Sequence, residues 1–162
     1  MATQSVTPED VDVSMVFYRE EGRWNVAALP ARGTTTMDSL LESLRRFPGE
    51  GGVMGGVAVG DEFFVLVRES GQSSRVMLSD GASTLDWSLA DEAASLIGYD
   101  EEDPEEYEPI GDVTLLQDFG VSADEIVSIC QDEDLYPDEQ LAAIAEHLGC
   151  APQWQAALND AR

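Results

Sequence analysis

The segment VMGGVAVGDEFFVLVR, residues 53–68, decides the fold. Its two runs, Val53 to Val59 and Phe63 to Arg68, are rich in the β-branched and aromatic residues that favour strands. Gly60-Asp61 between them tolerates the positive φ of a tight hairpin turn. Gly71-Gln72-Ser73 then precedes a third run, Arg75 to Leu78. These patterns predict three consecutive antiparallel strands.

Two further elements are predicted on the N-terminal side of this segment. Apolar residues alternate with other residues around Glu20-Glu21-Gly22-Arg23, which is typical of a β-hairpin with glycine in its turn; they are Met15, Phe17, Trp24, Val26 and Ala28. Thr35 stands three residues before Asp38, which predicts an amphipathic helix over about residues 36–47. The glycines from 49 to 56 precede a strand and lack a following Lys-Ser/Thr, so they indicate a loop and a close backbone approach at Gly55-Gly56, not a phosphate loop.

The C-terminal side is predicted to be helical. Ser88, with Asp91 three residues later, opens a helix that ends at Gly98. The next ten residues, YDEEDPEEYE, hold seven carboxylates and a proline, which oppose compact structure and indicate a linker. After a helical run that ends at Gly120, Ser122 and Glu125 form a capping box, and another helix begins near Pro137 and ends at Gly149.

The sequence therefore predicts an α+β protein with an antiparallel sheet and flanking helices in the order ββαβββα. An acidic linker and a small all-helical C-terminal module follow. We assign residues 1–12 to a flexible N-terminal tail, 13–98 to the α+β domain, 99–110 to the linker and 111–162 to the helical module. A unit of about fifty residues is too small to be comfortably stable alone, so the module is expected to pack on the sheet or on a partner.

Charge excludes several classes of function. The 162 residues include 33 acidic and 8 basic side chains, for a net charge of −25. Such a surface repels phosphate backbones and anionic lipids, so we expect no direct binding to nucleic acid or membrane. All the basic residues are arginines, which excludes lysine chemistry. The N-terminus has neither a basic region nor an apolar core, so we expect a cytoplasmic protein.

Residue patterns reveal no reaction centre. His147 is the sole histidine and is expected near a helix C-terminus at the surface, while Cys130 and Cys150 have no CxxC spacing and are expected to be buried thiols. Three Cys and His residues without paired spacing do not suit zinc. Residues 132–138 resemble a calcium loop but lack its glycine and its final glutamate. We therefore predict no catalytic, cofactor-binding or metal-binding residue.

The acidity favours binding to a basic protein, because opposite charges speed association and select partners. The same acidity is compatible with three alternative roles. The charge can be a solvated coat that reflects composition or salt adaptation. The protein can be a nucleic-acid mimic that inhibits an unrelated basic protein. It can also be a small metal-assisted enzyme that uses Asp or Glu, which would require acids converging in a pocket.

Six segments together resemble an actinobacterial family of tRNA adenosine deaminase-associated proteins. The resemblance spans about residues 14–158, and the segment DLYPDE (134–139) between two apolar helices is its most specific element. The six segments are WNVAALP (24–30), FFVLVR (63–68), VMLSD (76–80), LLQDFG (115–120), ICQDEDLYPDEQL (129–141) and IAEHLG (144–149).

The resemblance implies association with the enzyme that converts the wobble adenosine of tRNA to inosine. The chain lacks the HxE and PCxxC motifs of zinc deaminases, since Leu148-Gly149 follows His147, so a non-catalytic accessory or regulatory role is expected. The partner would be the deaminase or another basic protein. We predict that the partner-binding residues are Asp100, Glu101, Glu102, Asp103, Glu105, Glu106, Asp132, Asp134, Tyr136 and Pro137.

Overall fold

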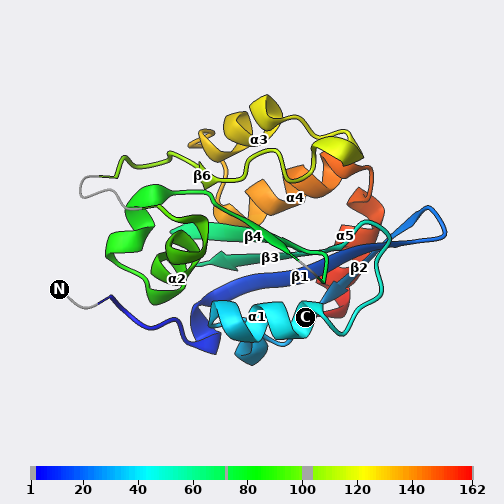
Figure 1. Ribbon diagram of the computed structural model, residues 1–162, viewed down its shortest axis with the longest axis horizontal. Helices are drawn as coiled ribbons and strands as arrows, with labels where there is room; N and C mark the ends of the chain where they lie inside the picture. Colours follow the sequence, from blue (N-terminus) through cyan, green and yellow to red (C-terminus); the bar gives the residue numbers. More distant parts are fainter. Residues whose placement is uncertain (1–2, 72, 100–103, 162) are drawn as a thin grey trace.

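A six-stranded antiparallel sheet forms the middle layer of the molecule (Figure 1). The computed structural model describes residues 3–71, 73–99 and 104–161. The strands lie in the spatial order β2-β1-β3-β4-β5-β6. They are β1 (Val11–Glu20), β2 (Arg23–Ala28), β3 (Val53–Val59), β4 (Phe63–Glu69), β5 (Ser74–Leu78) and β6 (Ile110–Gly111). The predicted α+β class and the antiparallel sheet are confirmed.

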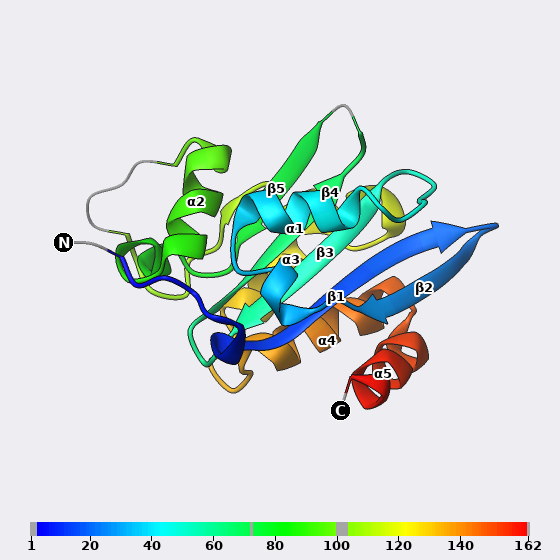
Figure 2. The ribbon, with the colours of Figure 1, turned by 90° about the horizontal axis from the view of Figure 1, so that it is seen from below.

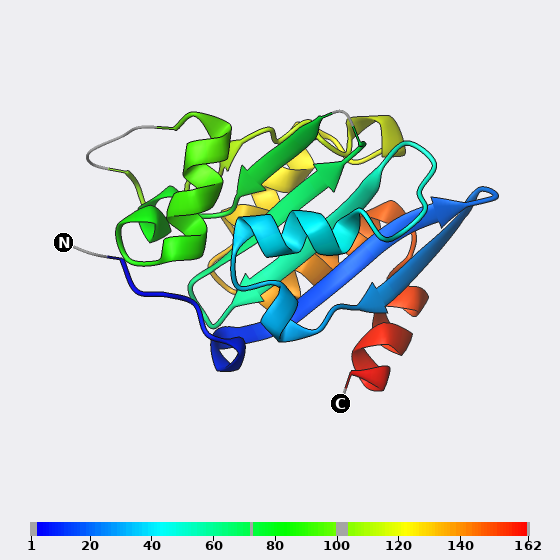
Figure 3. The ribbon, with the colours of Figure 1, turned by 60° about the horizontal axis from the view of Figure 1, so that its bottom comes forward.

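Helices cover both faces of the sheet. The α-helices among the described residues are α1 (Met37–Leu44), α2 (Ser88–Ile97), α3 (Ala123–Cys130), α4 (Pro137–Leu148) and α5 (Ala151–Asp160). The short 3-10 helices are η1 (Pro8–Asp10), η2 (Ala31–Gly33), η3 (Gly81–Leu85) and η4 (Gln117–Phe119). In the views from below, α1 and α2 lie in front of the sheet, and α4 and α5 lie behind it (Figures 2 and 3).

Strands β3 and β4 occupy the centre of the sheet and are buried along their whole length. Successive side chains of a strand point to opposite faces. Accordingly, Val57 and Val65 pack in the cluster under α1 and α2, while Ala58 and Phe64 pack in the cluster under α3, α4 and α5. The sheet thus carries two apolar cores, and each needs its own helical layer.

Two adjacent glycines of β3 let a helix approach each face closely. A Cβ at Gly55 would lie 2.8 Å from Leu44 Cδ2 of α1, and one at Gly56 would lie 3.0 Å from Leu141 Cδ2 of α4. Because neighbouring positions face opposite sides, this Gly-Gly pair thins the strand on both faces at the same level. The close backbone approach predicted at Gly55-Gly56 is confirmed.

The C-terminal helices share one core with the sheet. The buried cluster beneath them combines Met15, Met54 and Leu66 of the strands with Ile126 and Leu141 of the helices. The ring of Trp154 on α5 stacks on Phe17 of β1, with centroids 5.6 Å apart. The C-terminal helices were expected to pack either on the sheet or on a partner, and in the structure they pack on the sheet.

Local capping decides where most helices begin. Ser122 accepts the Glu125 N–H at the start of α3, and Pro137 and Gly149 bound α4, all as predicted. The cap of α1 is Thr36, whose side chain accepts the Ser39 N–H, so the predicted pairing of Thr35 with Asp38 is off by one residue. Helix α2 has Trp87 as its N-cap, which makes Ser88 its first residue.

Segments outside the predicted elements add contacts at the edges of the sheet. Ile110 begins β6, which pairs with β5, at the end of the stretch assigned to the linker. Within residues 1–12, Gln4 forms a bridge with Trp87 and Val6 is buried. Among the described residues, no helix has both the length and the apolar character needed to span a membrane.

Filling the space at Gly55 should destabilise the fold. Gly55→Val pushes against the buried end of Leu44, and overpacking of this kind costs about 1–3 kcal/mol of unfolding free energy. Urea unfolding of the purified variant measures the loss. In the Gly55→Val background, Leu44→Ala should cost less than it does alone, because it makes room for the valine. An unchanged urea midpoint for Gly55→Val would contradict the close packing.

Candidate functional site

Six of the eight arginines gather at one end of the sheet. The register places the β1–β2 turn and the β4–β5 turn at the same end of the sheet. Arg19 pairs with Trp24 in the first hairpin and Arg68 with Arg75 in the second, and β3, which starts at this end, lies between them. The C-terminal end of α1 joins them, because Arg45 lies 3.7 Å from Glu69. We call this region the arginine end; its arginines are Arg19, Arg23, Arg45, Arg46, Arg68 and Arg75.

Arg68 is buried and ties three segments together. Its Nη1 and Nη2 donate to the two carboxylate oxygens of Asp118 at 2.5 and 2.8 Å. Its Nε and Nη2 donate to the Gly51 carbonyl at 2.8 and 2.6 Å, and Nη1 donates to the Leu115 carbonyl at 2.8 Å. A guanidinium alone offers such a planar array of donors, so this position requires arginine rather than a generic cation. The glycine loop is thereby bound to the chain's own Arg68.

Aromatic rings complete this cluster. The guanidinium of Arg68 lies 4.4 Å from the ring centroid of Phe119, which meets the ring of Trp24 edge-on at 5.0 Å. Arg19 lies over both rings, at 5.4 Å from Trp24 and 5.7 Å from Phe119. Three of the six segments that resemble the deaminase-associated family therefore meet here, through Trp24 of WNVAALP, Arg68 of FFVLVR and Phe119 of LLQDFG.

Nearby acids neutralise most of the arginine end. Ion pairs join Arg45 to Glu69, Arg46 to Glu42, Arg68 to Asp118 and Arg75 to Asp112. The ion pairs with Arg68 and Arg75 lower the pKa of the Asp118 and Asp112 carboxyls. Of these arginines, Arg68 and Arg75 form the short pairs that join distant segments of the fold.

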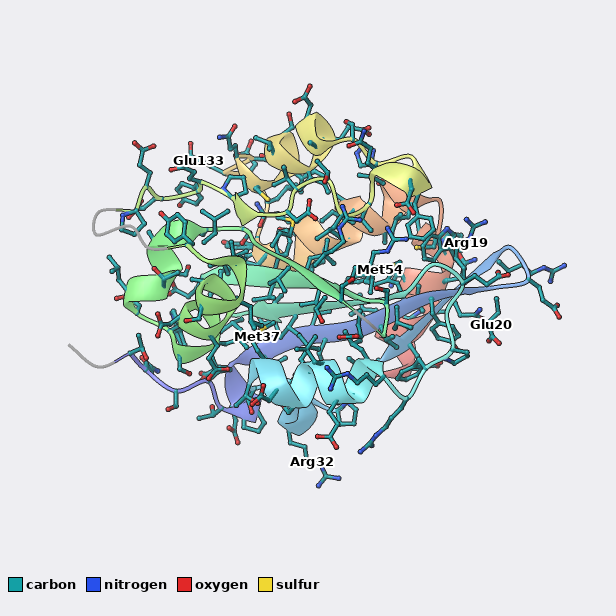
Figure 4. The ribbon with its side chains drawn as sticks, in the orientation of Figure 1. Arg19, Glu20, Arg32, Met37, Met54 and Glu133 are labelled. Atoms are coloured by element: carbon teal, nitrogen blue, oxygen red, sulfur yellow. The ribbon has the colours of Figure 1, made fainter. Side chains whose placement is uncertain are left out.

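The opposite end carries carboxylates without cations. Glu133 lies far from Arg19 and Glu20 across the molecule (Figure 4). We define the acidic end by its carboxylates, which come from the start of β1, the β3–β4 turn, the segment after β5, the approach to β6 and the loop into α4. These are Asp12, Asp61, Glu62, Asp80, Glu106, Asp132, Glu133, Asp134 and Asp138. Among the described residues, none of them takes part in an ion pair.

Asp80 stands at the centre of the acidic end. Burial raises the pKa of its carboxyl, and the carboxylates of Glu106 and Glu62 raise it further, against the backbone hydrogen bonds from Ala82 and Tyr107. Its charge is also close enough to raise the pKa of Cys130 at the end of α3. Asp80 thus links the Glu106 segment to the loop that follows α3.

Asp12 marks a second point of like charge. Burial again raises the pKa of its carboxyl, and the carboxylates of Asp138 on α4 and Asp61 in the β3–β4 turn add to the shift. Carboxylates raise one another's pKa where their negative fields overlap without compensation. The acidic end therefore gathers negative charges that no ion pair among the described residues offsets.

The predicted partner-binding residues that the structure describes lie in two segments, residues 105–106 before β6 and residues 132–137 at the approach to α4. Glu105 and Glu106 are exposed, and the Glu106 carboxylate is close enough to act on Asp80. Asp132 and Asp134 are exposed in the loop before α4, where Asp132 accepts the Asp134 N–H at 3.0 Å. Tyr136 caps α4 with 58% of its surface exposed, while Pro137 is buried in the first turn. Asp100, Glu101, Glu102 and Asp103 lie outside the described residues.

Sequence patterns missed several residues of this end. Asp12, Asp61 and Asp138 come from three distant segments of the chain. No local signal in the sequence predicts that β1 pairs with β3, or that α4 starts near Asp12. Tyr107, with 46% of its surface exposed, carries no signal that separates it from the rest of the acidic run. The sequence places Asp80 in a turn at the end of a strand, and its N-capping of η3 agrees with that placement.

The cysteines and the histidine do not form a reactive site. Burial raises the pKa of the Cys130 thiol to about 12 and that of Cys150 to about 11, so both remain protonated and unreactive near neutral pH. His147 lies at the surface, with Nδ1 2.6 Å from Glu125 Oε2. In the part of the chain that the structure describes, no three His, Cys, Asp or Glu side chains are arranged to hold a metal ion.

Comparison with known proteins assigns the chain to a family. A sequence profile described as Rv3753c-like tRNA adenosine deaminase-associated protein matches residues 12–151. The chain belongs to this family. It is also 36% identical over 157 residues to Protein Rv3753c of Mycobacterium tuberculosis (strain ATCC 25618 / H37Rv), in a match that covers 94% of this chain and 90% of the relative. No solved structure matches the chain significantly.

The residues matched by the family profile include parts of both the arginine end and the acidic end. Residues 12–151 run from Asp12 at the acidic end to the beginning of α5, and they include every residue of the Arg68 cluster. The resemblance drawn from the six segments is confirmed.

Replacing Arg68 should destabilise the protein without altering its net charge. Arg68→Lys removes the paired donors that bind Asp118 and leaves the carbonyls of Gly51 and Leu115, the latter buried, short of partners, at a cost of about 2–4 kcal/mol. Arg75→Lys is the matched control, since its more exposed pair with Asp112 should contribute less than about 1 kcal/mol. Equal losses in urea unfolding would contradict the role given to Arg68.

Neutralising Asp80 should stabilise the protein at pH 7. Because the folded-state pKa of Asp80 is raised, its charge costs stability progressively as the pH rises through the carboxyl range. Asp80→Asn should therefore unfold at higher urea than the parent at pH 7, and the difference should vanish at about pH 3, below the usual carboxyl pKa.

Asp118→Asn should behave in the opposite way. Its folded-state pKa is lowered, so the charge stabilises the fold above the usual carboxyl pKa, and this contribution is lost as the pH falls. The variant should be less stable than the parent at pH 7 and approach it in acid. If Asp80→Asn also lowered stability at pH 7, the described electrostatics of the acidic end would be wrong.

Proposed function

We propose that this protein is a non-catalytic accessory or regulatory partner of tRNA adenosine deaminase, and that it binds through its acidic end. Family membership supports the association with the deaminase. The observation that carries the binding mode is the set of acidic-end carboxylates, which have no ion-pair partner among the described residues. Burial raises the pKa of Asp80 and Asp12, and neighbouring carboxylates raise it further.

Uncompensated charge suits recognition of a basic surface. Carboxylates that destabilise one another in the free protein gain when arginines or lysines of a partner approach. Asp80 and Asp12 hold such charges on two sides of the same end. Binding of this kind speeds association and weakens as the ionic strength rises.

Two exposed tyrosines supply the apolar part of such an interface. Tyr107 and Tyr136 are among the few large apolar side chains that remain exposed, at 46% and 58%. Tyrosine is enriched at protein interfaces, since it combines a large ring with a hydroxyl group. Tyr107 directly follows Glu106 of the acidic end, and Tyr136 lies two residues after Asp134. The partner surface should therefore offer cations around an apolar centre.

The negative charge of the surface, which repels RNA phosphates, also supports the proposal. A tRNA-modifying enzyme needs a positive surface to hold phosphates, and an acidic companion can contact that surface without contacting the RNA. The chain lacks the HxE and PCxxC motifs, and its two thiols are buried and protonated, which supports a companion without deaminase chemistry of its own.

Charge reversal at the acidic end should weaken binding to the deaminase. In a titration of the purified tRNA adenosine deaminase of the same organism, Asp132→Arg/Asp134→Arg should raise Kd at least about tenfold at low salt. Tyr136→Ala should raise Kd by a smaller factor that varies little with salt. The matched control Glu20→Arg/Glu146→Arg makes the same change in net charge away from the acidic end and should leave Kd within about twofold.

Two outcomes would contradict the proposal. One is the absence of a complex between the parent protein and the deaminase even at low ionic strength. The other is equal binding of the parent to the deaminase and to several unrelated basic proteins, which would identify a nucleic-acid mimic instead.

A further inference from the structure

A groove runs along the first half of β1 and opens at the acidic end. Two hollows of about 410 and 300 Å³ share four lining residues, Asp12, Val13, Leu158 and Ala161, so they form one continuous depression. The larger hollow extends toward Leu29 and Pro30 after β2, and the smaller extends toward Asp138 and Glu139 at the start of α4.

The floor of the groove is a strand with one open edge. On one side, Val11 and Val13 pair with Val59 and Ala58 of β3. On the other side, pairing with β2 starts only at Met15, preceded by the hydrogen bond from the Leu29 N–H to the Ser14 carbonyl. Pro30, which has no N–H to donate, ends this pairing, and the chain continues into η2, which lies near β1 without extending the sheet. Over residues 11–13, none of the described strands pairs with this edge of β1, and such an edge accepts an added extended segment.

The walls of the groove differ in character. Apolar side chains line its length, among them Leu29, Ala142 and Leu158. Carboxylates stand at its open end, where Asp12, Asp138 and Glu139 have no cationic partner among the described residues. Residues of a bound strand alternate in direction, so one set would face Leu29 on the α1 side of the sheet, while the other faced the α4–α5 side, where the carboxylates stand.

We propose that this groove binds an extended segment of a protein partner in which apolar residues alternate with lysine or arginine. The segment would add to the open edge of β1 and place its cations against Asp12, Asp138 and Glu139. A second copy of this chain is a poor occupant, because its charge of −25 repels the acidic end and four of its arginines are already in ion pairs. The inference rests on the proposed function in that the segment belongs to the deaminase.

A model peptide tests the groove separately from the deaminase. The probe is a short capped peptide of alternating lysine and valine, titrated into the full-length protein and followed by fluorescence anisotropy and by backbone amide shifts in NMR spectra. We expect the largest shifts at residues 11–14 and at Leu158. A peptide of alternating lysine and serine should bind more weakly, and one of alternating glutamate and valine should not bind.

Two tryptophan substitutions on α5 and at its C-terminal end provide a matched pair of variants. Ala161 is exposed and lines both hollows, so Ala161→Trp should fill the groove and raise the Kd of the lysine–valine peptide at least about tenfold. Ala156 is exposed on α5 but lines neither hollow, and Ala156→Trp should change Kd less than about twofold. Circular dichroism and thermal unfolding should show that both variants keep the fold.

A matched pair of charge variants separates the groove from the rest of the acidic end. Asp12→Arg/Asp138→Arg should weaken peptide binding more than Asp132→Arg/Asp134→Arg, although the two pairs change net charge equally. Peptide shifts confined to the loop at residues 131–136 would overturn the proposal. Equal loss from the two charge pairs would also overturn it, as would a homodimer that Ala161→Trp dissociates.

The deaminase titration distinguishes the two proposals. If the peptide binds in the groove but the deaminase does not bind the protein, the groove stands and the proposed function fails. If the deaminase binds and Ala161→Trp leaves its Kd unchanged, the proposed function stands and the groove is not its binding site.

Discussion

The constraint on which the rest of this structure depends is that β3 and β4 are buried on both faces. A strand in that position has no solvent side, so each face of the sheet must be covered by helices that the chain supplies. Helices α1 and α2 cover one face, and α3, α4 and α5 cover the other. Gly55 and Gly56 set how closely the two layers approach. The N-terminal and C-terminal halves are therefore joined through a shared core, and Arg68 fastens that junction at one end.

Local patterns in the sequence predicted what local physics determines. The hairpins, the start of α3 at Ser122, the bounds of α4 and the close approach at Gly55-Gly56 all follow from turn residues, caps and side-chain volume. What sequence patterns missed depends on contacts between distant segments. The two-residue strand β6 forms because β5 offers it a free edge to pair with. No pattern near Arg68 in the sequence predicts that it binds Asp118 and the Leu115 carbonyl. Composition suggested an acidic surface, but its concentration around Asp12 and Asp80 comes from the register of β1 against β3 and from the path after β5.

The separation of charge gives the net figure of −25 a structural meaning. The chain has eight arginines and holds four of them in ion pairs at one end, where Arg68 and Arg75 each bind an aspartate. The other end is left with carboxylates that no described cation offsets. A protein with the same composition but evenly spread arginines would have many weak, screened pairs and no region of concentrated field. The ion pairs that stabilise the fold thus also determine where the molecule is able to attract a partner.

The stacking of Trp154 on Phe17 has a consequence for how the protein is made. The two residues are far apart in the chain, and α5, which carries Trp154, leaves the ribosome after all six strands. Until then, the face of the sheet that α4 and α5 will cover is open to water, with Met15, Phe17 and Phe64 exposed. A nascent chain with this apolar surface exposed is prone to aggregate and is a substrate for chaperones. The cover that α5 provides therefore bears on solubility in the cell as well as on the stability of the finished molecule.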